Sequence, residues 1–396
     1  MRVLITEEAL QTGVGHWTAY LAGITSHFRS KGDEVDVLCH ANATPEVLER
    51  VGGTPWFSRN CWLDTRSQGG IGGLLHNFIF RQQVAKWLRK AKSYDWICAL
   101  TMRTQHLLAF ALLARSPFLP RKTRFLLLFV QGFGVYSGPQ QPCRFVPNLS
   151  TRFARFCFHL LAPAVRTGRV ILAAETKGMQ EELGRFTGLC VSHYPHPVPP
   201  PSTRGHLERS DRSLTVTCPG FARYEKGTDL LQEAIRLLRG NQEMNHLHFV
   251  LQWLEPFEMP GGSTVKPDKS LASEGRVEYL TESLNEESYE DLLARSDLVI
   301  VPYRRESYHN RVSRVAIEAA SRSIPLIYTA GTWSGEVAEL AGAGVPITGE
   351  SSEAVAYALR RALDGFARLK EEASEGASRV IDFHSAEEFR RLMAGQ

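Results

Sequence analysis

The chain has 396 residues, of which 43% are hydrophobic and 22% are charged, and its formal net charge is +4. This length exceeds what one hydrophobic core usually serves, so we expect two domains in an ordinary globular protein. The apolar runs are too short to span a bilayer, the acidic start predicts no signal peptide, and seven scattered cysteines predict reduced thiols in a cytoplasmic protein.

The charge is divided unevenly along the chain. Residues 1–200 hold 23 Lys and Arg against 12 Asp and Glu, giving +11, whereas residues 201–396 hold 23 against 30, giving −7. No DNA-binding or RNA-binding motif accompanies the basic half, so we expect no nucleic acid as a partner. A negatively charged membrane surface or an anionic acceptor suits this half better.

A strand is predicted at Arg2–Thr6, followed by a loop and an amphipathic helix. The loop contains Gly13, Gly15 and His16, and a glycine-rich turn between strand and helix lets the backbone approach a ligand closely. A dinucleotide fingerprint would need a third glycine where Thr18 stands, so the loop does not predict NAD binding. The alternative interpretation is a tight turn with an exposed histidine.

Two basic stretches that are rich in aromatic residues lie at Ile71–Lys92 and Arg144–Arg169. They are interpreted either as core-packing helices with solvated cations or as amphipathic helices, one of which lies on an anionic leaflet. Between them, strands are predicted at Asp95–Leu100 and Phe125–Val130. The second of these strands leads into a glycine-rich loop, Gln131–Gly138.

The segment Tyr194–Pro201 contains five prolines, which remove backbone donors and fix φ, so it reads as a stiff linker. We therefore predict a first domain over residues 1–195, a linker over 196–210 and a second domain over 211–380. A C-terminal helix over 381–396 could cross back to the first domain.

The second domain opens with a predicted strand and turn at Leu214–Gly220, followed by Arg223 and Lys226. Two cations three residues apart at a strand end can both reach one diphosphate, Arg with a planar fork and Lys as a point charge. The alternative for this pair is solvated surface charge.

The segment Asp297–Glu336 predicts a doubly wound α/β unit. An apolar strand at Leu298–Val301 is followed by a polar loop at Arg304–Asn310 and by a helix that opens near Arg311 and ends at Pro325. In such a sheet, ligands bind in the crevice beyond the carboxyl ends of the strands.

The start of this helix predicts an anion site. The amides of Ser313, Arg314 and Val315 would point into the crevice and could bind a diphosphate. Glu318 follows one to two turns later, where it could accept hydrogen bonds from two vicinal hydroxyls. The alternative is that Glu318 pairs with Arg314 on a solvated helix face.

Both segments of the second domain resemble the donor-site motifs of the retaining GT-B glycosyltransferases, specifically glycosyltransferase family four (glycosyl transferases group 1). One motif runs through Gly220, Arg223 and Lys226. The other contains Glu318 followed by small residues and a proline. The family usually carries a second Glu at the place where this chain has Asn310, so the carboxylate pair is incomplete.

The resemblance also assigns roles to residues of the first domain. In the family, the first loop closes over the donor, and Gly13, Gly15 and His16 fit that use. A His-Gly or His-Asp pair often bears on the reacting sugar at the place where Gln131 and Gly132 stand, so the glycine is kept and the histidine is lost.

The resemblance implies an α/β protein with two doubly wound Rossmann-like domains facing across a cleft. It further implies transfer of a sugar from a nucleotide diphosphate sugar to the hydroxyl of a glycan or lipid-linked acceptor, with retention and without a metal or cofactor. Arg223 and Lys226 would stabilise the leaving diphosphate, Glu318 would hold the ribose, and Asn310 would touch the sugar.

Three other activities stay open. They are inverting transfer, nucleotide-sugar 2-epimerisation, and nucleotide-sugar binding by a non-catalytic subunit. The expected location is the cytoplasm, with peripheral association at the inner face of the membrane. The base, the sugar and the acceptor are not identified by the sequence.

Overall fold

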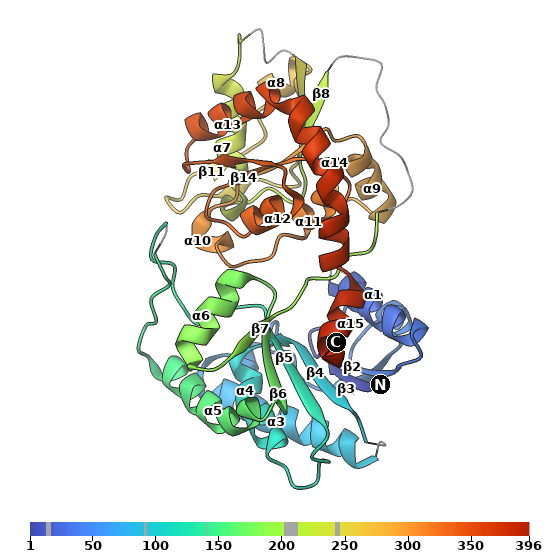
Figure 1. Ribbon diagram of the computed structural model, residues 1–396. Coiled ribbons are helices and arrows are strands. Elements are labelled where there is room, and N and C mark those ends of the chain that lie inside the picture. The colour runs from blue at the N-terminus through green and yellow to red at the C-terminus, as the bar shows by residue number, and fades with distance from the viewer. Residues whose placement is uncertain (13–16, 91–92, 140, 202–212, 242–245, 396) are drawn as a thin grey trace. The chain divides into compact units, whose positions relative to one another are not determined.

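The computed structural model describes residues 1–12, 17–90, 93–139, 141–201, 213–241 and 246–395 (Figure 1). The chain divides into two compact units. The first unit contains Met1–Ser137, Gln141–Pro199 and Ser385–Gln396, and the second contains Gly138–Gln140 and Pro200–His384. The C-terminal segment therefore belongs to the first unit.

The first unit is built on a seven-stranded parallel sheet with the order β3-β2-β1-β4-β5-β6-β7. Its strands are β1 Arg2–Thr6, β2 Glu34–His40, β3 Gly53–Phe57, β4 Trp96–Met102, β5 Arg124–Phe129, β6 Val170–Ala174 and β7 Val191–His193. β1 pairs in parallel with β2 on one side and with β4 on the other. The strand order therefore reverses between β1 and β4, which is the topological switch point of this sheet.

Helices cover both faces of this sheet. Alternate residues of β5 divide between two cores, because Phe125, Leu127 and Phe129 belong to one cluster, while Leu126 and Leu128 belong to the other. The first cluster packs under α3 Gly69–Lys90, α4 Thr104–Ala114, α5 Leu149–Arg166 and α6 Lys177–Thr187. The second packs under α1 Trp17–Ser30, α2 Pro45–Val51 and α15 Ala386–Ala394.

The second unit is built on a six-stranded parallel sheet with the order β12-β9-β8-β13-β14-β15. Its strands are β8 Leu214–Cys218, β9 Leu247–Gln252, β12 Val277–Leu280, β13 Leu298–Val301, β14 Leu326–Thr329 and β15 Gly344–Ile347. Its helices are α7 Thr228–Leu237, α8 Lys269–Ser273, α9 Glu286–Ala294, α10 Arg305–Tyr308, α11 Arg314–Ala320, α12 Ser334–Ala341, α13 Ser352–Asp364 and α14 Phe366–Phe383. A small hairpin joins β10 Phe257–Glu258 to β11 Thr264–Val265.

Several local expectations were wrong. The sequence predicts a loop over the polar segment Glu255–Gly275, but this segment holds the hairpin and α8. The polar loop predicted after β13 contains the short helix α10. The next helix begins at Arg314 rather than near Arg311. The sequence predicts a single helix over Ser352–Leu369, but the chain leaves helical geometry at Gly365, which separates α13 from α14.

All seven cysteines are free, and six of them are buried. Among the helices of the described residues, none is both long and apolar enough to cross a bilayer.

Candidate active site

The second sheet has its topological switch point at β8, which pairs with β9 on one side and with β13 on the other. In open parallel sheets the crevice for ligands lies beyond the carboxyl ends of the strands at such a point. The loop after β8 carries Arg223 and Lys226, and the loop after β13 carries Asn310 and Ser313. The topology of the sheet therefore places both predicted motifs at the same crevice.

Two glycines shape the loop after β8. Gly220 has φ +87°, its amide donates to Oε1 of Gln252 at 2.7 Å, and a Cβ at this position would collide with Nζ of Lys226. Gly227 has φ +63°, and a Cβ there would collide with the carbonyl oxygen of Pro302. Gly220 is therefore favoured by its backbone conformation, and Gly227 is required for both conformation and space.

Arg223 precedes a single 3₁₀ turn, Tyr224–Lys226, and Lys226 is its last residue. The Arg223 side chain is 54% exposed, and its nearest carboxylate, Glu225, is 3.8 Å away. Lys226 is partly buried, and this burial lowers the pKa of its ammonium group. Within the described part of the chain, no carboxylate forms an ion pair with Lys226, so the crevice holds a desolvated cation that an anionic ligand could neutralise.

A buried ion pair fixes the turn that carries these cations. Arg304, which follows β13, forms two hydrogen bonds to Asp229, at 2.9 and 2.7 Å, and stacks on the Tyr224 ring at 3.9 Å. It also donates to the carbonyl of Tyr224, and its own amide donates to the carbonyl of Glu225 at 2.9 Å. Sequence reasoning placed Arg304 in a polar loop and missed this contact.

The helix α11 is short, and a capping residue stands at its start. Ser313 is the buried capping residue, and its hydroxyl accepts a hydrogen bond from the amide of Ala316 at 3.3 Å. Arg314 and Val315 begin the helix, which has seven residues. Asn310 is partly exposed just after α10, in the loop that leads to this cap.

Glu318 is buried, and both of its carboxylate oxygens accept hydrogen bonds. Nε of Arg314 donates to Oε1 at 2.6 Å, and the hydroxyl of Tyr289 donates to Oε2 at 2.9 Å. The pair with Arg314 is the one that the alternative interpretation expected, but that interpretation was wrong about a solvated face, since Glu318 is 4% exposed. The contact with Tyr289 in α9 was not predicted.

The remaining predicted site residues belong to the first unit. Gly13, Gly15 and His16 fall outside the described residues. Gln131 is exposed at the carboxyl end of β5, and the loop after it wraps around the buried carboxylate of Glu182. That carboxylate accepts hydrogen bonds from the amides of Phe133 at 2.7 Å and Gly134 at 2.6 Å, and a Cβ at Gly132 would collide with it.

The switch point of the first sheet is filled by two buried carboxylates that sequence reasoning did not connect with the site. Burial raises the pKa of Glu7 to about 8, while the Thr101 hydroxyl, which donates to both carboxylate oxygens, opposes that rise. Burial alone would also raise the pKa of Glu8, but His106 and His76 outweigh it and hold that pKa well below its usual range. Their Nε2 atoms lie 3.2 and 3.0 Å from the Glu8 carboxylate.

This network includes the ligand atoms of Glu8, Cys61 and His106, which lie within 4.8 Å of one another. Its chemistry does not suit a metal. Burial raises the pKa of the Cys61 thiol far above its usual value, and Nδ1 of His106 accepts a hydrogen bond from the amide of Arg103 at 3.3 Å. A neutral His106 therefore carries its hydrogen on Nε2, facing Glu8, and lacks the lone pair that a metal needs there.

Comparison with known proteins gives one family match. The family model for glycosyl transferases group 1 matches residues 213–365, from β8 through α13. By sequence, no curated protein matches the chain at a significant level.

Solved structures are similar over the whole chain. HepE of Anabaena in complex with UDP has a TM-score of 0.65 at 15% identity, covering 100% of this chain and 99% of that chain. WaaG, a glycosyltransferase involved in lipopolysaccharide biosynthesis, has a TM-score of 0.60 at 14% identity, and both chains are covered completely. Sucrose-phosphate synthase from Thermosynechococcus elongatus has a TM-score of 0.61 at 14% identity, again with complete coverage. At these identities the likeness shows a shared fold.

Proposed function

We propose that this protein, a glycosyltransferase with the GT-B fold and a group 1 match in its second unit, transfers a sugar from a nucleoside diphosphate sugar to an acceptor hydroxyl with retention. The observation that carries the donor part of this proposal is Lys226. It is a partly buried cation at the switch point, has a lowered pKa, and stands beside the exposed Arg223. A diphosphate would neutralise both side chains.

In the proposed mechanism, departure of the nucleoside diphosphate is the step that needs charge stabilisation. Arg223 and Lys226 would bind the negative charge that builds on the leaving phosphate oxygens, and the amides of Ser313, Arg314 and Val315 would complete that site. Because the Asp229–Arg304 pair holds the turn in place, the two cations need little reorganisation before the reaction. We propose that these cations replace a metal ion and that no cofactor takes part.

Glu318 is proposed to hold the ribose. Each of its oxygens already accepts one hydrogen bond, and an ionised carboxylate can accept about four, which leaves two for the vicinal hydroxyls. Asn310 is proposed to contact the sugar, where its amide can donate as well as accept. Gln131 and Gly132, with Gly13, Gly15 and His16, are proposed to complete the donor site from the first unit.

A non-catalytic nucleotide-sugar-binding protein is the second candidate. It is favoured by the amides at Asn310 and Gln131, where the family that the sequence resembles has a carboxylate and an imidazole. The two candidates share the nucleotide site and differ only in turnover.

Hydrolysis of a donor panel without acceptor separates these candidates. The panel begins with UDP-glucose, because structures of HepE from Anabaena include complexes with UDP and with UDP-glucose. A transferase releases nucleotide slowly, whereas a binding protein shows a thermal shift with the same donor and no release. A panel that gives neither release nor a shift would refute the proposed nucleotide site.

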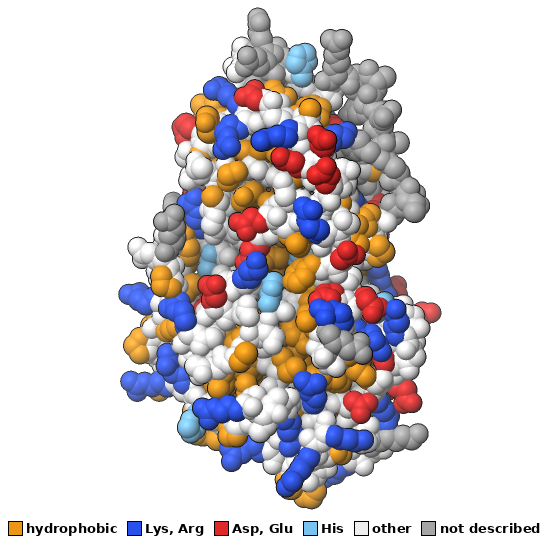
Figure 2. Space-filling view, viewed as in Figure 1, with side chains coloured by type: hydrophobic (Ala, Val, Ile, Leu, Met, Phe, Trp, Pro, Cys, Tyr) orange, Lys and Arg blue, Asp and Glu red, His pale blue; other side chains and the backbone are white. Residues whose placement is uncertain are grey.

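We also propose that the first unit associates with the anionic inner face of a membrane and takes a glycan or lipid-linked acceptor there. Lys and Arg side chains are spread over this unit (Figure 2). We choose α3 for this contact. Ile71, Leu74, Leu75 and Phe78 are exposed at helical spacing on one of its faces, and Lys86 and Arg89 continue that exposed face. A helix with this division suits a surface of apolar chains and anionic headgroups.

A further inference from the structure

Arg311 differs from the other arginines of its segment. The chain has five arginines between β13 and β14, and four of them bond to groups of the protein. The pairs are Arg304 with Asp229, Arg305 with the carbonyls of Ala330 and Thr348, Arg314 with Glu318, and Arg322 with Glu290. Among the described residues, the exposed side chain of Arg311 forms no ion pair, and its contact is with the ring of Tyr308.

This ring holds the guanidinium of Arg311 in place. The guanidinium carbon lies over the Tyr308 ring, 5.0 Å from its centre. Tyr308 is itself buried, and its ring packs against the buried ring of Tyr303 at a centre-to-centre distance of 4.1 Å. A guanidinium that lies over an aromatic ring uses its face for that contact and keeps its in-plane N–H groups for an anion. Arg311 is therefore a positioned cation with unused donors.

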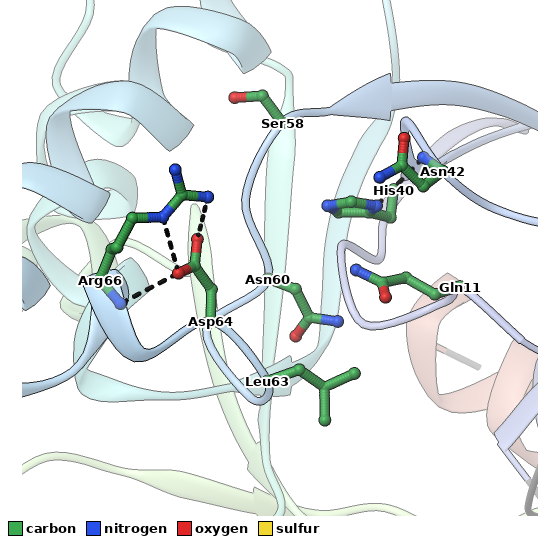
Figure 3. Close-up of a pocket in the computed structure, with 8 residues that line it drawn as sticks. All are labelled: Gln11, His40, Asn42, Ser58, Asn60, Leu63, Asp64 and Arg66. Atoms are coloured by element: carbon green, nitrogen blue, oxygen red, sulfur yellow. Dashed lines mark hydrogen bonds and ion pairs between the residues drawn. The ribbon is translucent and has the colours of Figure 1, made fainter.

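An arginine at a pocket of the first unit shows the more usual arrangement. Arg66 lines a polar pocket of about 280 Å³ and is 72% exposed, yet it forms two hydrogen bonds to the carboxylate of Asp64, at 3.0 and 2.9 Å (Figure 3). The protein thus supplies its own counter-charge to Arg66. It supplies none to Arg311 from the part of the chain that the structure describes.

Arg311 belongs to the same crevice as the two cations of the donor site. Burial is the main cause of the lowered pKa of Lys226, and the positive charges of Arg223 and Arg311 lower it further. Arg311 also directly follows Asn310, the residue that is proposed to contact the sugar. The third cation therefore stands on the sugar side of the proposed site.

The positive charge of this crevice exceeds the negative charge of an ordinary donor. A nucleoside diphosphate sugar carries one negative charge on each phosphate, and Arg223 and Lys226 match these charges. The nearby carboxylates do not serve Arg311, because Glu225 lies 3.8 Å from Arg223 and Glu318 accepts from Arg314. Arg311 gains an anionic partner only if the sugar carries a negative charge of its own.

We infer that the donor sugar carries a carboxylate, as in a nucleoside diphosphate uronate, and that Arg311 is the residue that selects it. This inference rests on the proposed function, since it assumes the nucleotide-sugar site. The planar fork of a guanidinium can donate two parallel hydrogen bonds to a carboxylate, whereas the CH₂OH group of a hexose offers one oxygen. The neutral amide of Asn310 suits such a sugar, because it places no negative charge beside the carboxylate.

Calorimetric titration of the full chain without acceptor tests the inference. The probes are donors paired so that they differ only in CH₂OH against carboxylate. The pairs are UDP-glucose with UDP-glucuronate, UDP-galactose with UDP-galacturonate, and GDP-mannose with GDP-mannuronate, and UDP and GDP alone are the references. We expect the uronate of one pair to bind roughly 10- to 100-fold more tightly than its hexose, as a charge-assisted bidentate contact would give.

Two variants assign this preference to Arg311. Arg311→Gln should remove it, weakening the uronate far more than the hexose or the nucleoside diphosphate alone. Arg311→Lys keeps the charge but loses the fork, so it should retain part of the preference. Both variants should fold, because the side chain is exposed. Arg360→Gln changes an exposed arginine of α13 and is the matched control, which should bind every probe as the wild type does.

The outcomes separate this inference from the proposed function. A uronate that binds no more tightly than its hexose in every pair would overturn the inference and leave the nucleotide site in place. Equal weakening of UDP, hexose and uronate in Arg311→Gln would assign Arg311 to the diphosphate and would also overturn it. Tight binding of a uronate without turnover would support the inference while refuting transfer. Failure of every probe to bind would refute the nucleotide site and this inference together.

Discussion

The two sheets use the same topological position in opposite ways. At the switch point of the second sheet, beside the loop that follows β13, Lys226 forms no ion pair among the described residues, and Arg223 has only a 3.8 Å contact with Glu225. At the switch point of the first sheet, Glu7 and Glu8 are carboxylates with less than 3% exposure, held by Thr101 and by two histidines. One position presents two cations, and the other holds two buried carboxylates.

The difference shows that topology supplies a place for a ligand and that side chains decide whether it is used. Burying a cation without an anionic partner costs free energy. A partly buried lysine with no such partner is therefore a candidate for binding an anionic ligand. A buried carboxylate between two imidazoles is already satisfied and acts as scaffold.

Breaking the scaffold should have the largest effect. Glu8→Gln removes the charge that His76 and His106 face and replaces one of the two acceptor oxygens with an NH₂ donor, which should lower the free energy of unfolding by about 3–5 kcal/mol. Denaturant unfolding of the full chain measures this. Glu34→Gln, at a glutamate with 75% side-chain exposure, is the matched control and should change little. Equal stability of the two variants would show that the network is not structural.

Removing the cations of the other switch point should affect turnover rather than folding. Lys226→Met or Arg223→Ala should each lower kcat by about 100- to 1,000-fold, the usual cost of losing one preorganised group that stabilises developing charge. Steady-state kinetics on the donor that the panel identifies provides the measurement, and Lys370→Met, at an exposed lysine of α14, is the control. Wild-type turnover in both cation variants would remove the donor site from this crevice.

The contribution of Glu7 to the stability of the protein should depend on pH. The pKa of Glu7 is raised from 4.5 to about 8, so the folded state binds the extra proton between these values, and its contribution to stability falls as pH rises through that window. The slope is at most about 1.4 kcal/mol per pH unit. In unfolding curves at pH 5, 7 and 9, the free energy of unfolding of Glu7→Gln should increase relative to that of the wild type as pH rises. A constant difference would mean that Glu7 is ionised throughout.

Much of the fold follows from local sequence pattern. The sequence predicts strands at Val277–Leu280 and Leu298–Val301 and a helix at Glu286–Ala294, and these are the observed bounds of β12, β13 and α9. β15 was missed because Gly344 and Pro346 weaken its strand signal, and α4 was missed because it is apolar on nearly every side and shows no helical period. Neither element can be predicted from its local sequence, because each depends on packing against its neighbours in the fold.

The candidate site divides in the same way. The sequence alone predicts that Arg223 and Lys226 lie close together, because they are three residues apart at the end of one strand. The contacts that hold the site could not be predicted, since Arg304 meets Asp229 across 75 residues of sequence and Tyr289 meets Glu318 across 29. The burial of Glu8 between His76 and His106 likewise depends on the packing of α3 and α4 against the end of β1.

The smallest effect concerns the surface of the first unit. Co-sedimentation with vesicles of phosphatidylserine and phosphatidylcholine at low salt should show binding through α3, and Leu75→Gln with Phe78→Gln should reduce it. The matched control is Leu149→Gln with Phe156→Gln, which removes exposed apolar side chains from α5 instead. Lys86→Gln and Arg89→Gln should each weaken binding by about 1 kcal/mol, roughly fivefold, and high salt should do the same because the attraction is screened. Equal losses from the α3 and α5 pairs would refute the choice of α3. Vesicle binding that changes neither with salt nor in the Lys86 and Arg89 variants would refute an electrostatic attachment of the basic unit. The positive charge of the unit would then be explained by binding of a soluble anionic acceptor.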